Sequence, residues 1–154
     1  MEKVVEIEPV EVENFFAQYE SRFNEALAGG EPDIDSVVNS FAEYFIEASP
    51  VGIVAGENNK KFRKMIAQGW ESYQKIGIRS MHILSKEVTI LDPLHAIAKI
   101  HWNCAFVRPD KSTGEVDFNV FYLVQKQEDD LKIFAYITGD EQQALKDQGL
   151  IPNN

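Results

Sequence analysis

The amino-acid sequence predicts an α+β fold in which N-terminal helices pack across the concave face of a curved antiparallel sheet. Between residues 13 and 75 most apolar side chains recur at the spacing of an α-helix, whereas residues 78–138 follow a period of two. A run of helices followed by a run of strands is typical of folds that segregate the two kinds of element. The expected order is ααβαββββ with a short C-terminal helix, and such a sheet with its helices encloses a cone with a mouth.

The whole chain is expected to form one domain. Its 154 residues, 44% hydrophobic and 26% charged, suit a single globular domain with one buried core. No repeat, low-complexity tract or linker divides the sequence. We therefore assign residues 1–154 to one domain, with residues 1–12 as an extended lead-in and residues 139–154 as a terminal helix and tail.

Composition excludes several classes of partner. The formal net charge of -10 argues against nucleic acid and against an anionic membrane surface, because both favour basic proteins. The chain has no long apolar run behind a basic start, and no stretch of about 18 uncharged apolar residues that a membrane helix would need. A single cysteine rules out an internal disulfide and suits a reducing compartment, so we expect a cytoplasmic protein.

Three helices are expected in the first half of the chain. The first begins near Glu13 and ends at residues 29–30, which are both glycine. The third runs from about Asn58 to Lys75, and residues 51–55 form a short strand before it. The second helix is expected from Ile34 until residues 49–50, where proline disfavours helical geometry, and its buried stripe is Ile34, Val37, Val38, Phe41, Phe45 and Ala48.

A long hairpin between Ala96 and Lys126 is the central feature of the expected sheet. Residues 110–114 supply turn chemistry, and placing Asp110 opposite Gly114 puts the apolar residues of both arms on one face. In that register the inward pairs are Phe106–Phe118, Cys104–Val120, Trp102–Tyr122 and Ile100–Val124.

Two further strands and a helix complete the expected sheet. Residues 78–91 are expected to form one long strand with a bulge, because no single face stays apolar throughout. Residues 131–138 form the last strand, and residues 140–143 have the arrangement of a capping box that starts a terminal helix. The inward side chains of the last strand are then Leu131, Ile133, Ala135 and Ile137.

This element order resembles the nuclear-transport-factor-2-like superfamily, which includes branches similar to polyketide cyclases, ketosteroid isomerases and scytalone dehydratases. The resemblance covers residues 13–138 and includes Ser49-Pro50-Val51-Gly52-Ile53-Val54-Ala55-Gly56, Ile100-His101-Trp102 and Leu131-Lys132-Ile133. It implies a cystatin-like cone fold and does not imply one activity, since this fold hosts unrelated functions.

The superfamily's enzymes imply particular site residues, and this sequence departs from them. Isomerases of this type use an acidic base with a tyrosine-based oxyanion hole, and dehydratases and cyclases use a histidine–aspartate pairing. The core strands of this chain place no aspartate on their predicted inward face, since Asp117 falls outward with Asn119.

The inward aromatic residues predict a pocket for a small apolar or aromatic ligand. Apolar and aromatic walls with a few polar tips are the common form of a small-molecule site. The alternative is that these side chains fill the core. Phe45 is an alternative to Tyr44 as a wall residue, and the predicted pocket residues are Tyr44, Trp70, Trp102, Cys104 and Tyr122.

His82 is the candidate catalytic residue. Counting back across the turn at residues 92–93 places it opposite Cys104 on the inward face, where its near-neutral pKa would allow proton transfer. A bulge between Lys86 and Val88 would turn it outward. The alternative role is that of a hydrogen-bonded structural histidine.

The outward face of the sheet is expected to form a homodimer interface. A free monomer would leave aromatic and aliphatic side chains on that face partly exposed to water, and the superfamily commonly pairs by this face. The alternative is a solvated sheet with scattered hydrophobic residues. The interface residues are Phe121, Leu123, Phe134 and Tyr136.

The remaining chemistry points to no cofactor and no metal. The histidines show no HxH or HExxH spacing. Cys104 has no cationic neighbour in the pattern and is expected to be a buried, inert thiol. Glu47 and Glu71 lie at the edges of buried helix faces. The alternatives are that one of them reaches the pocket or that both are solvated, and solvation is the expectation. The leading hypothesis is a small-molecule-binding cone domain acting as a lyase or isomerase, and the alternative is a non-catalytic dimeric binding or association module.

Overall fold

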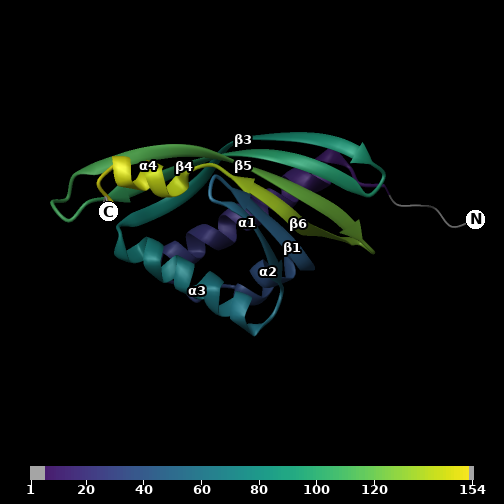
Figure 1. Cartoon of the computed structure of the whole chain (residues 1–154), viewed down its shortest axis with the longest axis horizontal. Helices are drawn as coiled ribbons and strands as arrows, with labels where there is room; N and C mark the ends of the chain where they lie inside the picture. Colours follow the sequence, from purple (N-terminus) through teal and green to yellow (C-terminus); the bar gives the residue numbers. More distant parts are fainter. Residues whose placement is uncertain (1–5, 153–154) are drawn as a thin grey trace, which may run out of the picture.

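The computed structural model describes residues 6–152 and consists of one sheet with helices packed against it (Figure 1). Its six strands lie in the order β2-β1-β6-β5-β4-β3. Helices α1, α2 and α3 lie on the same side of this sheet (Figure 1). The elements are α1 (Pro9–Leu27), α2 (Ile34–Asn39), β1 (Phe41–Ser49), β2 (Gly52–Glu57), α3 (Lys60–Lys75), β3 (Ile78–Asp92), β4 (His95–Val107), β5 (Thr113–Gln127), β6 (Asp130–Thr138) and α4 (Glu141–Asp147).

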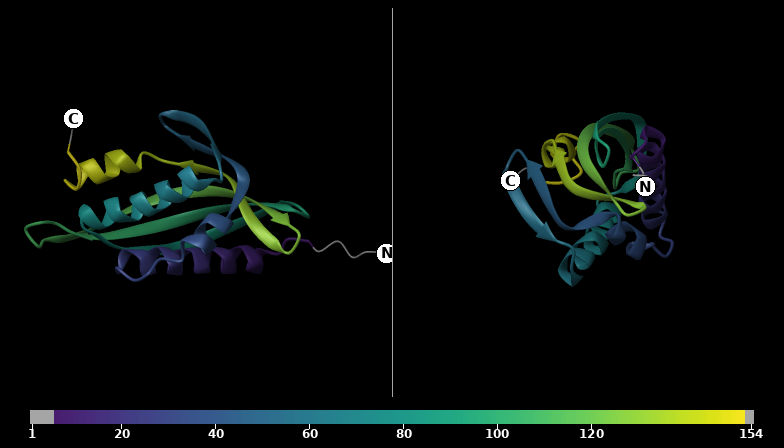
Figure 2. Two further views of the ribbon diagram at one scale, coloured as in Figure 1. Left: turned by 90° about the horizontal axis from the view of Figure 1, so that it is seen from below. Right: turned by 90° about the vertical axis from the view of Figure 1, so that its right-hand side faces the viewer.

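The α+β class and the cone-like architecture are confirmed, but the sheet differs from the expected one in two ways. The sheet contains one more strand than expected. Strand β1 pairs with β6 in parallel, whereas all the other strand pairs of the sheet are antiparallel. The hairpin of β1 and β2 extends beyond the rest of the sheet (Figure 2). Strand β1 thus replaces part of the predicted second helix, whereas β2 lies where a short strand was expected.

The second helix is much shorter than predicted. Helix α2 ends at Asn39, and the segment that was expected to continue it forms β1. Phe41 and Phe45 are both buried, and their spacing of four residues fits the period of a strand as well as that of a helix. Pairing of β1 with strands on both sides decides between the two conformations.

The first helix starts earlier than predicted and the third matches the prediction closely. Helix α1 begins at Pro9 near its first position, where the missing N–H of proline costs no helical hydrogen bond. The predicted lead-in of residues 1–12 is therefore wrong from residue 9 onward, and its residues 1–5 lie outside the described part. Helix α3 ends before Gly77, whose φ of 98° and contact with the Val107 carbonyl leave no room for a side chain.

The central hairpin is confirmed, but its predicted register is wrong. Phe106 lies opposite Gly114 and Trp102 lies opposite Phe118, so each inward residue is paired four positions closer to the turn than expected. The turn occupies residues 108–112, and its Arg108 N–H donates to the Ser112 carbonyl at 2.8 Å. Because the shift is even, the inward and outward faces are preserved.

Helix α1 is fixed to the edge of the sheet by side-chain hydrogen bonds. Asn24 accepts from the Met81 N–H and donates to the Met81 carbonyl, both at 2.8 Å, as a neighbouring strand would. Glu20 accepts from the Ile83 N–H of the same strand. These bonds cover part of the free edge of β3 and orient the inner face of α1 toward the sheet.

The core is centred on Trp102 and Tyr122. Trp102 is 2% exposed, and its Nε1 donates to the Tyr122 hydroxyl at 3.2 Å. Tyr19 and Phe23 of α1 each lie with ring centroids 6.3 Å from Trp102. The pair therefore joins the middle of the sheet to the helix that covers it.

Replacing Trp102 by alanine should lower the free energy of unfolding by about 3–5 kcal/mol, because a fully buried ring is lost and a cavity remains. Tyr122→Phe removes only one hydrogen-bond acceptor and should cost about 1 kcal/mol. Urea unfolding of both variants measures the two losses. If Trp102→Ala lost less free energy of unfolding than Tyr122→Phe, the central position of the Trp102 ring would be contradicted.

Candidate functional site

A cavity of about 380 Å³ lies between the helices and the inner face of the sheet. A smaller recess of about 80 Å³, which shares several of its wall residues, continues toward Met81, Trp102 and Phe118. A second hollow of about 360 Å³ lies beneath β2 and shares Glu47, Phe62 and Tyr136. The walls of the main cavity are formed by Tyr19, Phe23, Val37, Phe41, Glu47, Phe62, Ile66, Gly69, Trp70, Tyr73, Val120, Tyr122, Tyr136, Thr138 and Glu141.

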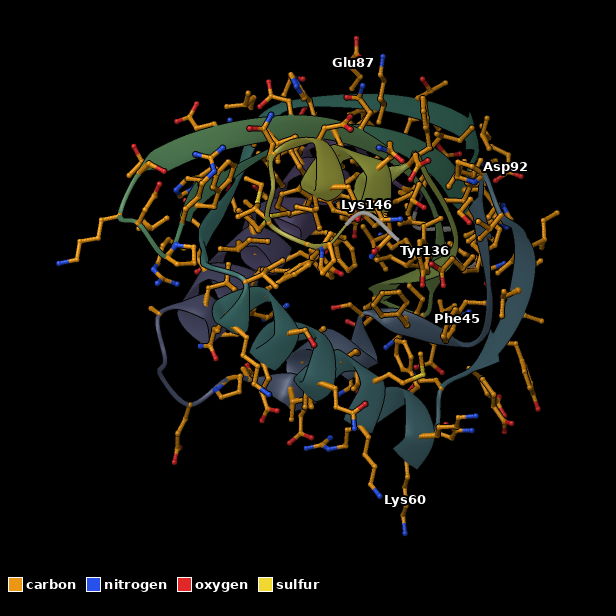
Figure 3. All side chains as sticks on the ribbon, turned by 60° about the vertical axis from the view of Figure 1, so that its left-hand side comes forward. Phe45, Lys60, Glu87, Asp92, Tyr136 and Lys146 are labelled. Atoms are coloured by element: carbon orange, nitrogen blue, oxygen red, sulfur yellow. The ribbon has the colours of Figure 1, made fainter. Side chains whose placement is uncertain are left out.

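Aromatic rings from α1, α3 and three strands form most of the wall. Helical spacing places Phe62, Ile66, Trp70 and Tyr73 along the side of α3 that faces the sheet. The centroids of Phe41 and Phe62 lie 5.1 Å apart, and those of Tyr122 and Tyr136 lie 6.4 Å apart. Figure 3 shows Tyr136 and Phe45 inside the curve of the sheet, whereas Lys60, Glu87 and Asp92 point outward.

Two carboxylates enter this aromatic cavity from different elements. Glu47 lies on β1 directly opposite Tyr136 of β6, on the inward side of both strands. Glu141 is the first residue of α4, and Asp140 caps that helix by accepting from the Gln143 N–H at 2.9 Å. The cap fixes the start of α4, and this brings the Glu141 side chain to the cavity wall.

The environment of Glu141 favours its protonated form. Burial, followed by repulsion from the Glu47 carboxylate, raises the pKa of Glu141 from 4.5 to about 7. The carboxyl is therefore near half-ionisation at neutral pH, where it can either donate or accept a proton.

The tyrosine hydroxyls around the cavity remain protonated donors. Burial raises the pKa of Tyr19, Tyr73 and Tyr122 above the usual value of 10. Burial and the neighbouring Glu47 carboxylate raise the pKa of Tyr136 in the same way. The site thus combines one titrating acid with several neutral hydrogen-bond donors on an apolar wall.

The profile of the NTF2-like protein family DUF6841 matches residues 8–141. The chain belongs to this NTF2-like family. A search of curated proteins finds no match. The family match covers every element that contributes a wall residue, from α1 to the first residue of α4.

Solved structures share this NTF2-like fold at low sequence identity. An NTF2-like protein with a cystatin-like fold from Novosphingobium aromaticivorans has a TM-score of 0.66 and 12% identity, covering 93% of this chain and 88% of its own. A ketosteroid isomerase-like protein from Erwinia carotovora atroseptica has a TM-score of 0.60 and 16% identity over 84% and 93%. A protein of unknown function with a cystatin-like fold from Nostoc punctiforme has a TM-score of 0.58 and 14% identity, covering 84% of this chain and 88% of its own. At these identities the likeness shows the fold.

His82 does not face the cavity of this NTF2-like domain, so its predicted inward position is wrong. A register shift between Ile83 and Ser85 places His82 opposite Asn103 instead of Cys104. Its side chain is 60% exposed, and its Nδ1 lies 3.7 Å from Glu20. The strand does contain a bulge, a few residues before the position between Lys86 and Val88 that would have turned His82 outward.

The structure separates the other predicted pocket residues into three groups. Trp70 and Tyr122 line the main cavity, and Trp102 lines the adjoining recess. Cys104 is buried behind the wall and borders none of these spaces, and burial raises the pKa of its thiol to about 11. Tyr44 is 65% exposed and lies on the opposite face of the sheet, because its segment is a strand in which Phe45 takes the inward position.

One predicted interface residue belongs to the cavity instead. A register shift between Leu123 and Val124 in the pairing of β5 with β6 changes the alternation of β6 after Ile133. Tyr136 therefore faces inward, and its predicted outward position is wrong. Phe121, Leu123 and Phe134 lie outside this cavity, and Phe121 is 38% exposed.

Sequence reasoning considered Glu47 as a pocket residue but favoured a solvated position for it, and it missed Glu141. Glu47 was placed at the edge of a helix, although the strand reading of Phe45 and Glu47 puts a carboxylate on an apolar face and is a usable signal. Glu141 was treated only as part of a helix cap, and nothing local marks it as a cavity residue. Glu71 is exposed on α3 and does not line the main cavity.

The described residues show no site for a metal ion and no spanning helix. Within residues 6–152 no group of three or more His, Cys, Asp or Glu side chains is arranged to hold a metal. None of the helices in that range is long and apolar enough to cross a membrane.

Replacing Glu141 by glutamine should change how stability depends on pH. Between about pH 4.5 and about 7 the folded wild type keeps a proton that the unfolded chain has released, so its unfolding free energy falls as pH rises. Glu141→Gln removes this loss. The free energy of unfolding of the variant, relative to that of the wild type, should therefore rise by on the order of 1–3 kcal/mol across that window.

Urea unfolding at several pH values measures this difference. Glu71→Gln, on the exposed side of α3, is the matched control and should follow the wild-type profile. Parallel profiles for Glu141→Gln and the wild type would contradict the burial of a neutral carboxyl.

Proposed function

We propose that this chain binds a small molecule with a largely apolar or aromatic body and acts on it as a lyase or isomerase. Glu141 serves as the acid–base residue. One observation carries this proposal: a carboxyl that is near half-ionisation at neutral pH lies on the wall of an aromatic cavity of about 380 Å³. The ketosteroid isomerase-like neighbour supports the fold on which such chemistry is possible.

The chemistry follows from the groups on the cavity wall. As a carboxylate, Glu141 accepts a proton from a carbon next to a carbonyl, and the C–H electron pair forms an enolate. Tyr19, Tyr122 and Tyr136 are protonated donors that stabilise the oxygen as it gains charge. Glu141 then returns the proton to a different carbon in an isomerisation, or to a departing group in an elimination.

Hydrogen–deuterium exchange tests this function without a known substrate. The wild type should accelerate exchange at the carbon next to the carbonyl in small aryl ketones, tested with and without an amino group, as followed by proton NMR in D2O. Glu141→Gln should slow the exchange by about 100- to 10,000-fold, because it removes the proton acceptor.

The control is His82→Gln, which alters the exposed histidine that the sequence favoured. It should leave exchange unchanged. Equal exchange rates for Glu141→Gln and the wild type would exclude Glu141 as the acid–base residue.

The alternative function is a dimeric binding or association module, and the outer face of the sheet favours dimerisation. Phe121 lies opposite Ile137, and these side chains are 38% and 48% exposed. Leu123 and Phe134 lie nearby on the outward side. We infer that a second copy covers this face, whether or not the cavity supports turnover.

A cytoplasmic location remains our expectation for this protein.

Phe121→Glu should convert the dimer into a monomer, because it replaces an apolar side chain of the proposed interface with a charged one. Sedimentation at micromolar concentration measures the mass in solution. The matched control is Phe121→Leu, which keeps the apolar character and should remain dimeric. Sedimentation of the wild type as a monomer would contradict this interface.

A further inference from the structure

We propose that the molecule held in the cavity is a cation, namely a protonated amine attached to an aromatic or aliphatic body. This inference deepens the proposed function, because it rests on the cavity being a small-molecule site and adds the charge of its ligand. The geometry behind it is a pair of carboxylates, Glu47 and Glu141, on an otherwise aromatic wall.

The charges on the wall all have the same sign. Glu47 and Glu141 are its only carboxylates, and none of the described lining residues is Lys, Arg or His. Lys61 lies in the neighbouring hollow beneath β2, together with Glu57. An anionic ligand would therefore meet two acidic groups without a compensating cation, whereas an ammonium group would be attracted to both.

The aromatic rings add a second attraction for a cation. The faces of tryptophan, tyrosine and phenylalanine are electron-rich and bind ammonium groups, most strongly where water is excluded. Trp70, Tyr122 and Tyr136 lie on the same cavity wall as the carboxylates. The same rings offer apolar area for the rest of an aryl or alkyl amine, and about 380 Å³ is within the range of small-ligand sites.

Repulsion between the two carboxylates gives the cation a specific role. Glu47 is the residue whose charge opposes ionisation of Glu141. Six elements contribute titratable groups near Glu141. These groups are Tyr19 (α1), Glu47 (β1), Tyr73 (α3), Cys104 (β4), Tyr122 (β5) and Tyr136 (β6). Apart from Glu47 these groups are neutral at neutral pH.

An ammonium group beside Glu47 would offset that repulsion and lower the pKa of Glu141. Glu141 would then release its proton as the ligand binds and become the carboxylate base that the proposed function requires. Ligand binding and activation of the base are thus linked through one pair of side chains.

Three probes of similar size and different charge test the inference. Phenethylamine, phenethyl alcohol and hydrocinnamate are titrated into the full chain at about pH 7, and tryptophan fluorescence reports binding because Trp70 lies on the wall. Phenethylamine should bind at least about tenfold more tightly than the alcohol, and hydrocinnamate should bind most weakly. Calorimetry in two buffers should show proton release with the amine alone.

Variants locate the effect. Glu47→Gln should reduce the preference for the amine to less than about threefold, and Glu141→Gln should abolish proton release. Glu87→Gln changes the net charge equally on the outer surface, where that side chain points away from the cavity (Figure 3), and should retain the full preference. Gly69→Phe places a ring at the cavity wall, where a Cβ meets nothing within 4 Å, and should weaken all binding.

The outcomes separate this inference from the proposed function. Equal or tighter binding of phenethyl alcohol would overturn the cation and leave the small-molecule site intact. If Glu87→Gln and Glu47→Gln lost the preference for the amine equally, that preference would come from the net charge of the protein. This result would also overturn the inference of a cationic ligand. Failure of all three probes to bind would overturn both proposals.

Discussion

The alternation of side chains along the sheet strands, and the places where it is interrupted, determine which residues reach the cavity. A strand sends successive side chains to opposite faces, so one extra residue exchanges the faces of everything beyond it. The shift in β3 between Ile83 and Ser85 turns His82 to the solvent. The shift beside β6 brings Tyr136 inward, opposite Glu47. Because of these two register shifts, Tyr136 lies on the cavity wall beside Glu47, and His82 does not.

The cavity carboxylates show how this geometry sets chemistry. Burial disfavours the charged form of Glu141, and the nearby Glu47 carboxylate disfavours it further. The second effect requires Glu47 to lie on the cavity wall, and the expected solvated position at the edge of a helix face would not have placed it there. The asymmetry also assigns different roles, because Glu141 carries the movable proton while Glu47 supplies the charge that controls it.

The sequence predicted the α+β class and most of the elements, but it missed strand β1, the hairpin register and much of the site. Period-two patterning identified the long hairpin, and its inward face survived an incorrect register because the error was an even number of residues. Trp70 and Tyr122 were found for the same reason, since helical and strand periods place them toward the sheet and the helices.

The missed residues depend on information that local patterns do not contain. Phe41 and Phe45 fit a helical and a strand period equally well, so pairing with β2 and β6 had to decide the conformation and, with it, the position of Glu47. Bulge positions depend on how two strands accommodate each other's curvature, and the bulge in β3 was foreseen without its exact place. Glu141 reaches the cavity through the packing of α4, which its cap sequence does not reveal.

The titration of Glu141 tests the central claim most directly. Carbon-13 NMR of the glutamate side-chain carboxyls, assigned with Glu141→Gln, gives its pKa in the intact protein. The structure predicts a pKa of about 7 for Glu141, and a lower value in Glu47→Gln because the opposing charge is removed. A pKa near 4.5 that does not respond to Glu47→Gln would contradict the account.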